Sequence, residues 1–453
     1  MSKSTTAKAS TPTSLKKAVI GSMVGTSLEW YDFFLYGSAA ALVFNHVFFP
    51  SFNPVVGTLL ALATFSIGFI ARPIGGVIAG HFGDRIGRKN VLLATLLVMG
   101  GTTVAIGLIP SYDTIGIAAP IILILLRVLQ GIALGGEWAG GALMIAERAP
   151  DARRGFLTSF VQVGVPIGTL LSAAVLFILS ALLNEGQFLS WGWRLPFVLS
   201  ILVVILGVYI RRQVSESPAF IALSEVEDSK AEPEAKRVPI IEVLKEQPFD
   251  VLRVVGIRVG GDIVYYTCAT FMLTYVAQHL GLPRSIGLLA SVIGAGFQIV
   301  ACPGFARLSD RFGRRPVTIF GAVGCMVWVF AFFPLMNTRS TTLIVIAVVT
   351  GLIFQAAMYG VQAAWICELF DTKHRYSGAS IGYQLSGVVG GSLAPIIALS
   401  LLATFDSTVP VQLYIVLGCV IVMLTALATR ETRGINIMPQ AQHSPNNSVS
   451  PSV

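Results

Sequence analysis

Apolar runs of about 20 residues recur along the whole chain, and they restrict its fold more than any other feature. A helix of that length crosses the hydrocarbon core of a bilayer. Only 12% of the 453 residues are charged, and the mean hydropathy is +0.77. A soluble protein of this length would need more polar residues to cover its surface. The chain is therefore predicted to be an all-α membrane protein with the lipid bilayer as its surroundings.

Charged or turn-rich breaks divide the apolar sequence into twelve predicted spans. They lie near residues 18–45, 54–80, 91–110, 116–146, 155–183, 194–211, 251–279, 284–306, 316–336, 341–367, 376–404 and 410–429. The N-terminal residues resemble the start of a signal peptide. The apolar run behind them is longer than the apolar region of a signal peptide and contains two carboxylates, so we expect a retained first helix.

The Lys and Arg residues are distributed unequally between the two sides that alternate loops would face. Of the 31 Lys and Arg residues, 25 lie on the side that holds both termini. Three lie on the opposite side, and three lie within the spans. Because cytoplasmic loops carry the excess of Lys and Arg, both termini are predicted in the cytosol of a bacterial cell membrane. This topology also explains the net charge of +8. A nucleic-acid partner is not expected.

A polar stretch near the middle separates two sets of six spans. The predicted organisation is a cytoplasmic N-terminal tail (1–17), an N-terminal half (18–212), a cytoplasmic central loop (213–250), a C-terminal half (251–430) and a disordered cytoplasmic tail (431–453). The middle of the central loop is charged and poor in aromatic residues, which predicts flexibility. Its last part, "VPIIEVLKEQP", is predicted to form a short interfacial helix.

Two loops share one pattern at the matching place in each half. The loop after span 2 reads "GHFGDRIGRK" (Gly80–Lys89), and the loop after span 8 reads "ARLSDRFGRR" (Ala306–Arg315). Glycine permits a tight turn, and an aspartate is stabilised near the N-terminus of a neighbouring helix, where it could latch the two halves. The loops after spans 4 and 10 also match, since each is flanked by Glu and Arg seven residues apart. The repeat predicts a duplicated transporter with these gating residues: Gly83, Asp84, Arg85, Gly87, Arg88, Asp310, Arg311, Gly313, Arg314, Glu147, Arg154, Glu368 and Arg375.

These loops resemble the signature loop of the major facilitator superfamily. Further stretches are similar to its metabolite:proton symporter family: "EWYDFFLYG" (Glu29–Gly37), "FIARPIGGVIAGHFGDRIGRK" (Phe69–Lys89), "RVLQGIALGGEWAGGALMIAERAP" (Arg127–Pro150) and "SWGWRLPF" (Ser190–Phe197). "AALVFN" (Ala40–Asn45) and "SGASIGYQLSGVVGGSLAP" (Ser377–Pro395) resemble the shikimate carriers of that family. The resemblance covers all twelve spans and implies two six-helix halves that work by alternating access.

Two carboxylates interrupt the first apolar run. On a helix, Glu29, Asp32 and Tyr36 lie at positions i, i+3 and i+7, so they share one face. An ionised carboxylate inside a membrane is costly unless it is paired or in contact with water. Asp32 is therefore predicted to face a cavity or a cation and to bind and release a proton. Glu29 is either a second proton-coupling residue or a partner of another helix.

Arg127, in the middle of span 4, is the predicted cation, and Gln130 lies one turn further along. Because arginine stays charged, a proton on Asp32 would release Arg127 to hold an anionic substrate. The resemblance also associates an arginine at this point with proton coupling; a static salt bridge is the alternative. Glu137, about 15 Å along the helix, is predicted as a gate, a structural pair or a substrate contact. Arg72 is expected to snorkel or cap.

The C-terminal half supplies a second set of polar residues within spans. Arg258 and Asp262 lie at i and i+4 in span 7, and either pair with each other or leave Arg258 to bind an acidic substrate. In span 10, Gln355, Tyr359 and Gln362 share a face that suits a hydroxylated ligand or hydrogen bonds between helices. The predicted substrate-binding residues are Tyr36, Arg127, Gln130, Arg258, Tyr265, Gln355, Tyr359 and Gln362.

The predicted function is proton-coupled import of a small organic acid, with shikimate or a similar hydroxylated monocarboxylate as the first choice. A betaine or proline carrier and a di- or tricarboxylate carrier of the same family are alternatives, and a drug antiporter is less favoured. The sequence contains no phosphate-binding loop, metal cluster or nucleophile with a base, so neither an enzyme, a cofactor nor a metal is expected. We expect a monomer, although the sequence leaves the oligomeric state open.

Overall fold

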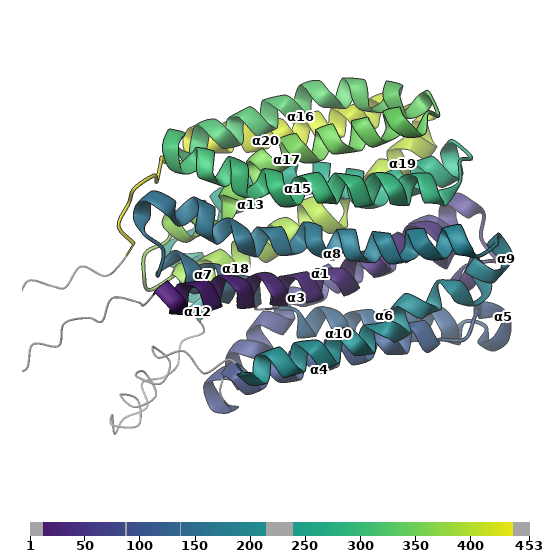
Figure 1. Ribbon diagram of the computed structural model, residues 1–453, viewed down its shortest axis with the longest axis horizontal. Coiled ribbons are helices and arrows are strands. Elements are labelled where there is room, and N and C mark those ends of the chain that lie inside the picture. Colours follow the sequence, from purple (N-terminus) through teal and green to yellow (C-terminus); the bar gives the residue numbers. More distant parts are fainter. Residues whose placement is uncertain (1–11, 87, 136, 214–238, 438–453) are drawn as a thin grey trace, which may run out of the picture.

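The structure, a computed structural model, describes residues 12–437 except 87, 136 and 214–238. It leaves undescribed the side chains at 12–14, 17, 77, 79–92, 137, 203, 209–213 and 239–241. The described residues form helices and connecting loops without strands, which confirms the all-α prediction. The long helices run side by side along the long axis of the molecule (Figure 1).

Each predicted span of the N-terminal half is helical. The helices of these spans are α1 (Pro12–Leu42), α3 (Pro54–Ile86), α4 (Arg88–Leu108), α6 (Ala118–Ala133) with α7 (Glu137–Ala146), α8 (Arg154–Leu182) and α10 (Arg194–Gln213). Shorter segments lie between them: α2 (Phe44–Phe48), α5 (Tyr112–Ile115), η1 (Asp151–Arg153), α9 (Glu185–Gln187) and η2 (Phe188–Gly192). The fourth span is thus broken into α6 and α7.

Each predicted span of the C-terminal half is helical as well. Its segments are α13 (Pro248–Tyr266), η3 (Thr267–Phe271), α14 (Met272–Thr274), η4 (Tyr275–His279), α15 (Arg284–Phe312), α16 (Arg314–Asn337), α17 (Thr341–Leu369), α18 (Arg375–Ser386), η5 (Gly387–Ser392), α19 (Ala394–Phe405) and α20 (Val409–Ala428). Spans 7 and 11 contain the π-helical segments η3, η4 and η5. Such segments occur often at functional sites.

Eight helices of the described residues are long and apolar enough to cross a bilayer, and a ninth span is formed by Glu185–Gly192 with Arg194–Val208, which are bent by 44°. The first, third and seventh predicted spans are not among them. The first and seventh carry buried charged side chains, and the third contributes only the shorter apolar helix Leu93–Leu108 within the described residues. Side chains on the outside of the bundle are apolar, as a lipid-facing surface requires. Examples are Leu125, Leu202, Val300 and Val327.

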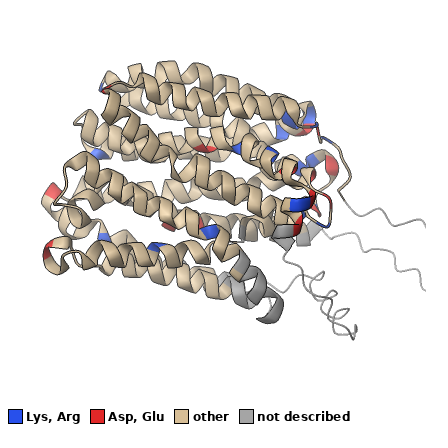
Figure 2. Ribbon diagram, turned by 180° about the vertical axis from the view of Figure 1, so that it is seen from behind, with Lys and Arg blue, Asp and Glu red and all other residues tan. Residues whose placement is uncertain are grey.

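The two halves form two groups of helices that meet lengthwise (Figure 1). Helices α1, α3, α7 and α8 of the first half contact α15, α17, α18, α19 and η3 of the second. Charged residues gather mainly at one end of the bundle, and single charges lie in its middle (Figure 2). This end carries the loops that the sequence predicts to be cytoplasmic.

The last part of the central loop forms the short helix α12 (Pro239–Glu246). It is tied to the loop after span 10 by a 2.9 Å ion pair between Glu242 and Lys373, and the Glu242 carboxylate raises the pKa of Lys373. The tail is predicted to be disordered from residue 431, but its first seven residues are described. Residues 431–437 are described and packed, because Thr432 is fully buried and donates a hydrogen bond to Glu368. The remaining tail and residues 214–238 lie outside the described residues.

Candidate substrate and proton site

Asp32 and Arg127 lie in one buried chain of hydrogen bonds. Thr103 of α4 donates to Asp32 Oδ2 at 3.1 Å, and Gln130 donates to Thr103 at 2.8 Å. Arg127 Nη1 in turn donates to Gln130 Oε1 at 2.5 Å. All four side chains are buried, at 1% exposure or less. The sequence places the carboxylate beside the cation, whereas the structure places two hydrogen-bonding side chains between them.

Both ends of this chain keep a polar atom without a partner. Asp32 Oδ1 and Arg127 Nε make no hydrogen bond. Buried polar atoms normally have a partner, so such atoms within a membrane-spanning bundle mark a place where a proton or a ligand can bind. No ion pair joins Asp32 to Arg127, although both side chains are described. The static salt bridge considered for these two residues is therefore absent from this structure.

Arg127 is held against α1 and α3. Its Nη2 atom donates to the Phe65 carbonyl at 3.1 Å, and its guanidinium carbon lies 3.8 Å from the centre of the Tyr36 ring. A Cβ at Gly68 would lie 2.8 Å from Nη2, so glycine is needed at this position to make room for the arginine. Tyr36 thus contacts Arg127 through its ring, while its hydroxyl bonds Thr64 at 2.5 Å.

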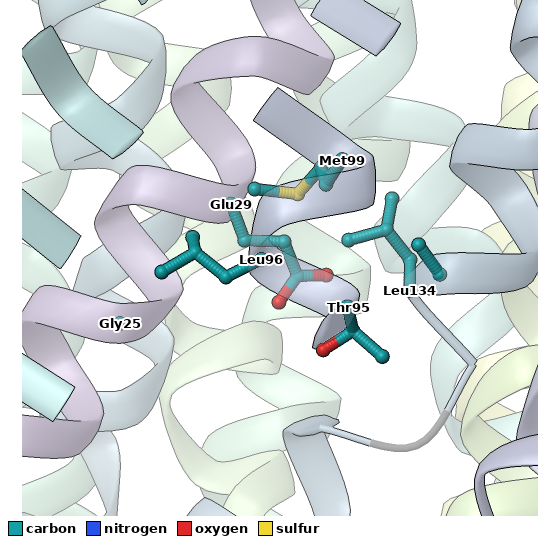
Figure 3. Close-up of a pocket in the computed structure, with 7 residues that line it drawn as sticks. Gly25, Glu29, Thr95, Leu96, Met99 and Leu134 are labelled. Atoms are coloured by element: carbon teal, nitrogen blue, oxygen red, sulfur yellow. The ribbon is translucent and has the colours of Figure 1, made fainter. Parts of the chain in front are cut away.

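Glu29 lies one turn before Asp32 on α1, and it also faces α4. Its carboxylate points into a cavity of ≈ 10 Å³ (Figure 3). That volume is close to the smallest that holds one water molecule. The other lining residues are Gly25, Thr95, Leu96, Met99, Ala133 and Leu134. The two predicted proton-coupling carboxylates therefore share one helix interface.

Arg72 of α3 is buried at the centre of the bundle, and the expectation that it snorkels or caps is wrong. Its side chain is 2% exposed. Its guanidinium carbon lies 4.7 to 5.3 Å from the ring centres of Phe33, Phe69 and Trp30. The physical reason is helix length, since α3 continues for about four turns beyond Arg72. The side chain also packs inward against these three rings instead of extending along the helix.

In the C-terminal half, Arg258 and Asp262 form a bidentate ion pair within α13. The Nε–Oδ2 and Nη2–Oδ1 distances are both 2.9 Å, and Ser386 adds a hydrogen bond to Oδ2 at 3.1 Å. The guanidinium carbon lies 3.3 Å from the centre of the Tyr383 ring, and Nη1 has no partner. Of the two alternatives for Arg258, pairing with Asp262 is the one observed, with one nitrogen left for a ligand.

The polar residues of α17 divide into two kinds. Gln355 accepts a hydrogen bond from Gln298 at 2.6 Å and donates to the Gly261 carbonyl at 3.2 Å, so it joins helices. Both amide atoms of Gln362 are buried without a partner, although the side chain lies on the same helix face. Tyr359, between them, is also buried. Gln362 is thus the residue of this face whose amide atoms have no hydrogen-bond partner.

Aromatic side chains fill the centre of the interface between the halves. Phe34 of α1 lies 5.4 Å from Tyr265, measured between ring centres, and Phe65 and Phe69 lie 6.1 and 5.8 Å from Tyr266. The Tyr265 hydroxyl also forms a 2.6 Å hydrogen bond with Thr169 of α8. Tyr265, predicted to bind substrate, therefore joins the two halves in this structure.

Both ends of the interface are closed by polar contacts. Gln278 donates to Thr58 at 2.8 Å at the end opposite the charged loops. Near the charged end, the Trp138 ring of α7 stacks on Tyr383 of α18 at 3.8 Å, and Gln162 of α8 donates to the Tyr359 carbonyl of α17 at 3.1 Å. The central residues thus lie between contacts that would have to break before either side opens.

A buried charge network joins the halves at the charged end of the bundle. Arg154, at the start of α8, lies 3.1 Å from Glu368 at the end of α17, and Arg314 lies at the same distance from Glu368. Asp310 pairs with Arg314 at 2.7 Å and accepts backbone hydrogen bonds of 2.8 and 2.9 Å from the first turn of α8. An aspartate is stabilised at that helix end.

The other predicted gating residues are placed less centrally. Gly313 has a φ of 106°, which favours glycine, and forms the turn between α15 and α16. Arg375 lies 4.0 Å from Glu147, and the Arg311 carbonyl accepts from Arg433. The other predicted gating residues lie where the structure does not describe side-chain placement or burial: Gly83, Asp84, Arg85, Gly87, Arg88 and Glu137.

A family profile decides the classification. The profile described as "Major Facilitator Superfamily" matches residues 22–395 and 260–445. The chain belongs to the major facilitator superfamily. Members of this superfamily are multi-pass membrane transporters and not enzymes, which confirms these two predictions.

Individual relatives agree with the superfamily assignment. The chain is 41% identical to the shikimate transporter of Escherichia coli over 420 residues, which covers 92% of this chain and 95% of that protein. It is 34% identical to the proline/betaine transporter of Escherichia coli over 421 residues, covering 92% and 84%. Among solved structures, the proton:xylose symporter XylE has a TM-score of 0.71 at 18% identity, over 94% of this chain and 98% of that one. This likeness confirms the predicted superfamily fold of twelve helices.

Sequence reasoning missed three residues of this transporter's centre. Thr103 and Ser386 each bond a buried carboxylate, but a hydroxyl inside a span has no pattern that separates it from one that bonds its own helix. Arg72 carried a usable signal, because its position deep within a long apolar helix marks an intramembrane charge.

Proposed function

We propose that this superfamily member is a symporter that imports a small hydroxylated monocarboxylate together with a proton. The observation that carries the proposal is the hydrogen-bond chain from Asp32 through Thr103 and Gln130 to Arg127. It connects one group that can bind a proton with one that can hold an anion. Shikimate is the first substrate to test, a choice supported by the 41% identical relative.

The charges in this chain explain how proton and substrate are coupled. With Asp32 ionised, its negative charge balances the fixed positive charge of Arg127. A proton on Asp32 removes that balance, and a substrate carboxylate restores it at Arg127. Binding both together leaves the net charge of the buried site unchanged, which favours the conformational change of the loaded transporter. We therefore expect one proton for each monocarboxylate at this site.

Thr103 permits the chain to exist in both protonation states. Its hydroxyl oxygen has two lone pairs and one proton. With Asp32 ionised, the hydroxyl donates to the carboxylate. With Asp32 protonated, it can accept from the acid and donate instead to the Met99 carbonyl, which lies 3.0 Å away. Gln130 keeps its hydrogen bond to Thr103 throughout, so Arg127 stays in place while the proton arrives.

Groups for the rest of the substrate come from the C-terminal half. The amide of Gln362, the Nη1 atom of Arg258 and the Oε1 atom of Gln298 are buried without partners. A molecule with several hydroxyl groups can satisfy such atoms, whereas an apolar drug cannot. The aromatic side chains between the halves supply flat apolar surface for a ring.

The main alternative is a carrier for betaine or proline, which the 34% identical relative supports. A quaternary ammonium group binds best among aromatic rings. In this chain the cluster of Trp30, Phe33 and Phe69 already holds the guanidinium of Arg72. That arrangement favours an anionic substrate over a zwitterion.

Uptake of labelled shikimate in cells that express the chain tests the substrate. Shikimate and close ring analogues should compete for uptake, and betaine and citrate should not. Uptake of betaine, or of a di- or tricarboxylate, without uptake of shikimate would contradict the substrate proposal and leave the superfamily assignment intact.

A further inference from the structure

Arg72 has an unusual environment for a buried arginine. Its Nε and Nη2 atoms have no hydrogen-bond partner. Among the described side chains, no carboxylate lies within 4 Å of its guanidinium. Leaving a buried charge without a counter-charge costs several kcal/mol in proteins, and evolution rarely keeps one without a use. The Nε and Nη2 atoms of Arg72 are therefore available to a group that enters the site.

The free atoms form one edge of the guanidinium, and Arg258 shows what that edge binds. In Arg258, the same Nε and Nη2 atoms hold the carboxylate of Asp262 at 2.9 Å each. Two parallel N–H groups match two carboxylate oxygens in this geometry. In Arg72 the equivalent edge is unoccupied by protein. Its shape and charge fit one carboxylate group.

The aromatic side chains around Arg72 hold it without using that edge. Trp30, Phe33 and Phe69 are all buried, and their rings interact with the guanidinium as a cation. Such contacts do not consume N–H groups. The guanidinium is thus held in place while its hydrogen-bonding edge stays available.

A second arginine converges on the same place. Arg127 lies 5.4 Å from the centre of the Phe33 ring, which Arg72 also contacts at 4.7 Å. Gly68, which makes room for Arg127, is one helical turn or about 6 Å from Arg72 along α3. The Nε atom of Arg127 is also unpartnered. Two buried cations around one ring repel each other unless an anion binds near both.

We propose that Arg72 binds the carboxylate of the transported substrate bidentately, with Arg127 as the second cation of the same subsite. This inference rests on the proposed function and adds a residue that determines specificity for anions. Arg72 supplies affinity for the carboxylate, whereas Arg127 also connects that carboxylate to the proton on Asp32. Removing Arg72 should therefore weaken binding without uncoupling transport from the proton.

Equilibrium binding to the purified full-length protein tests this assignment, with shikimate and its methyl ester as the probe pair. Arg72→Gln should weaken shikimate binding at least tenfold and leave ester binding unchanged. Arg72→Lys, which keeps the charge but loses the flat edge, should be intermediate. Arg72→Lys also provides the test if Arg72→Gln does not fold. The matched control is Arg253→Gln, at a partly exposed arginine near the start of α13, which should preserve the preference for the acid.

Each outcome decides between the two proposals. If Arg72→Gln keeps the wild-type preference for the acid over the ester, or loses affinity for both equally, the carboxylate subsite is wrong. If the wild-type protein binds neither shikimate nor its ester, the substrate proposal fails. Glycine betaine and choline then become the probe pair, because only glycine betaine carries a carboxylate. Weaker betaine binding in Arg72→Gln then supports the subsite. Unchanged betaine binding, or no wild-type binding of betaine, overturns it.

Discussion

Thr103 donates a hydrogen bond of 3.1 Å to Asp32, and this contact attaches the predicted proton-binding carboxylate to α4. The same hydroxyl accepts from Gln130, the residue that bonds Arg127. Thr103 is therefore the only described side chain that bonds both Asp32 and Gln130. The proposed coupling therefore depends on the hydroxyl group of Thr103 more than on the size of its side chain.

Replacing Thr103 with valine should uncouple the transporter while preserving its shape. The variant keeps a side chain of similar volume but removes the hydrogen bond to Asp32, and a hydrogen bond to a charged group is worth about 1.5–3 kcal/mol. Uptake driven by an imposed pH gradient in proteoliposomes should fall about tenfold or more. Thr103→Ser keeps the hydroxyl and should retain most of the uptake. Equal activity in Thr103→Val and the wild type would show that the hydrogen-bond chain has no part in coupling.

Glu368→Gln should destabilise the closed arrangement at the charged end. The Glu368 side chain is fully buried and contacts Arg154 and Arg314, so losing its charge leaves each of these buried arginines with one carboxylate, Asp151 or Asp310, in place of two. Breaking a buried pair costs about 3–5 kcal/mol. We expect a lower unfolding temperature in detergent and faster labelling of the native Cys367, which is buried next to Glu368.

The matched control for Glu368 is Glu246→Gln on α12. Glu246 pairs with Lys373 at 3.6 Å, and both side chains are about half exposed or more. Exposed pairs contribute about 0–1 kcal/mol, so this change should be nearly silent. If the two variants unfold at the same temperature, the buried network does not hold the halves together.

Gly68→Ala should impair transport through Arg127. The added methyl group would lie 2.8 Å from the Nη2 atom, and the arginine would have to leave its position against Tyr36. Gly101→Ala in α4 is the control, because nothing lies within 4 Å of a Cβ there. Substrate uptake should drop about tenfold in Gly68→Ala, which corresponds to a loss of about 1.4 kcal/mol. It should stay unchanged in Gly101→Ala. Normal uptake by a folded Gly68→Ala protein would contradict the tight fit.

The orientation remains a prediction from charge, and accessibility measurements test it. Single cysteines at Asn184 and Thr338 should react with an impermeant reagent added outside intact cells, and one at Lys230 should not. The five native cysteines are buried, so the background should be low. External labelling at Lys230 would place the termini on the wrong side.

The elements that carry the site could be predicted from sequence because charged residues are rare within spans. Asp32, Arg127 and Arg258 stood out for that reason, and each lies in the helix expected for it. Their partners did not stand out. Thr103 and Ser386 bond carboxylates from neighbouring helices, and a single sequence does not tell which helices are neighbours.

Arg72 and Gln362 illustrate a second limit. The sequence places Arg72 eight residues before the expected end of span 2 and predicts that it snorkels or caps, whereas its guanidinium packs against three aromatic rings from α1 and α3. Gln355 and Gln362 share a helix face and looked equivalent. They differ because Gln298 and the Gly261 carbonyl lie beside only one of them. Such distinctions come from packing across helices and have no counterpart in local periodicity.

The central claim is that the proton which drives uptake binds Asp32, and the Asp32→Asn protein in proteoliposomes tests it most directly. An amide keeps the size of the carboxylic acid but cannot release a proton. We predict that this variant exchanges labelled for unlabelled shikimate across the membrane yet fails to accumulate it when a pH gradient is imposed. Accumulation by Asp32→Asn at the wild-type level, under the same gradient, would contradict the claim and make Glu29 the next candidate.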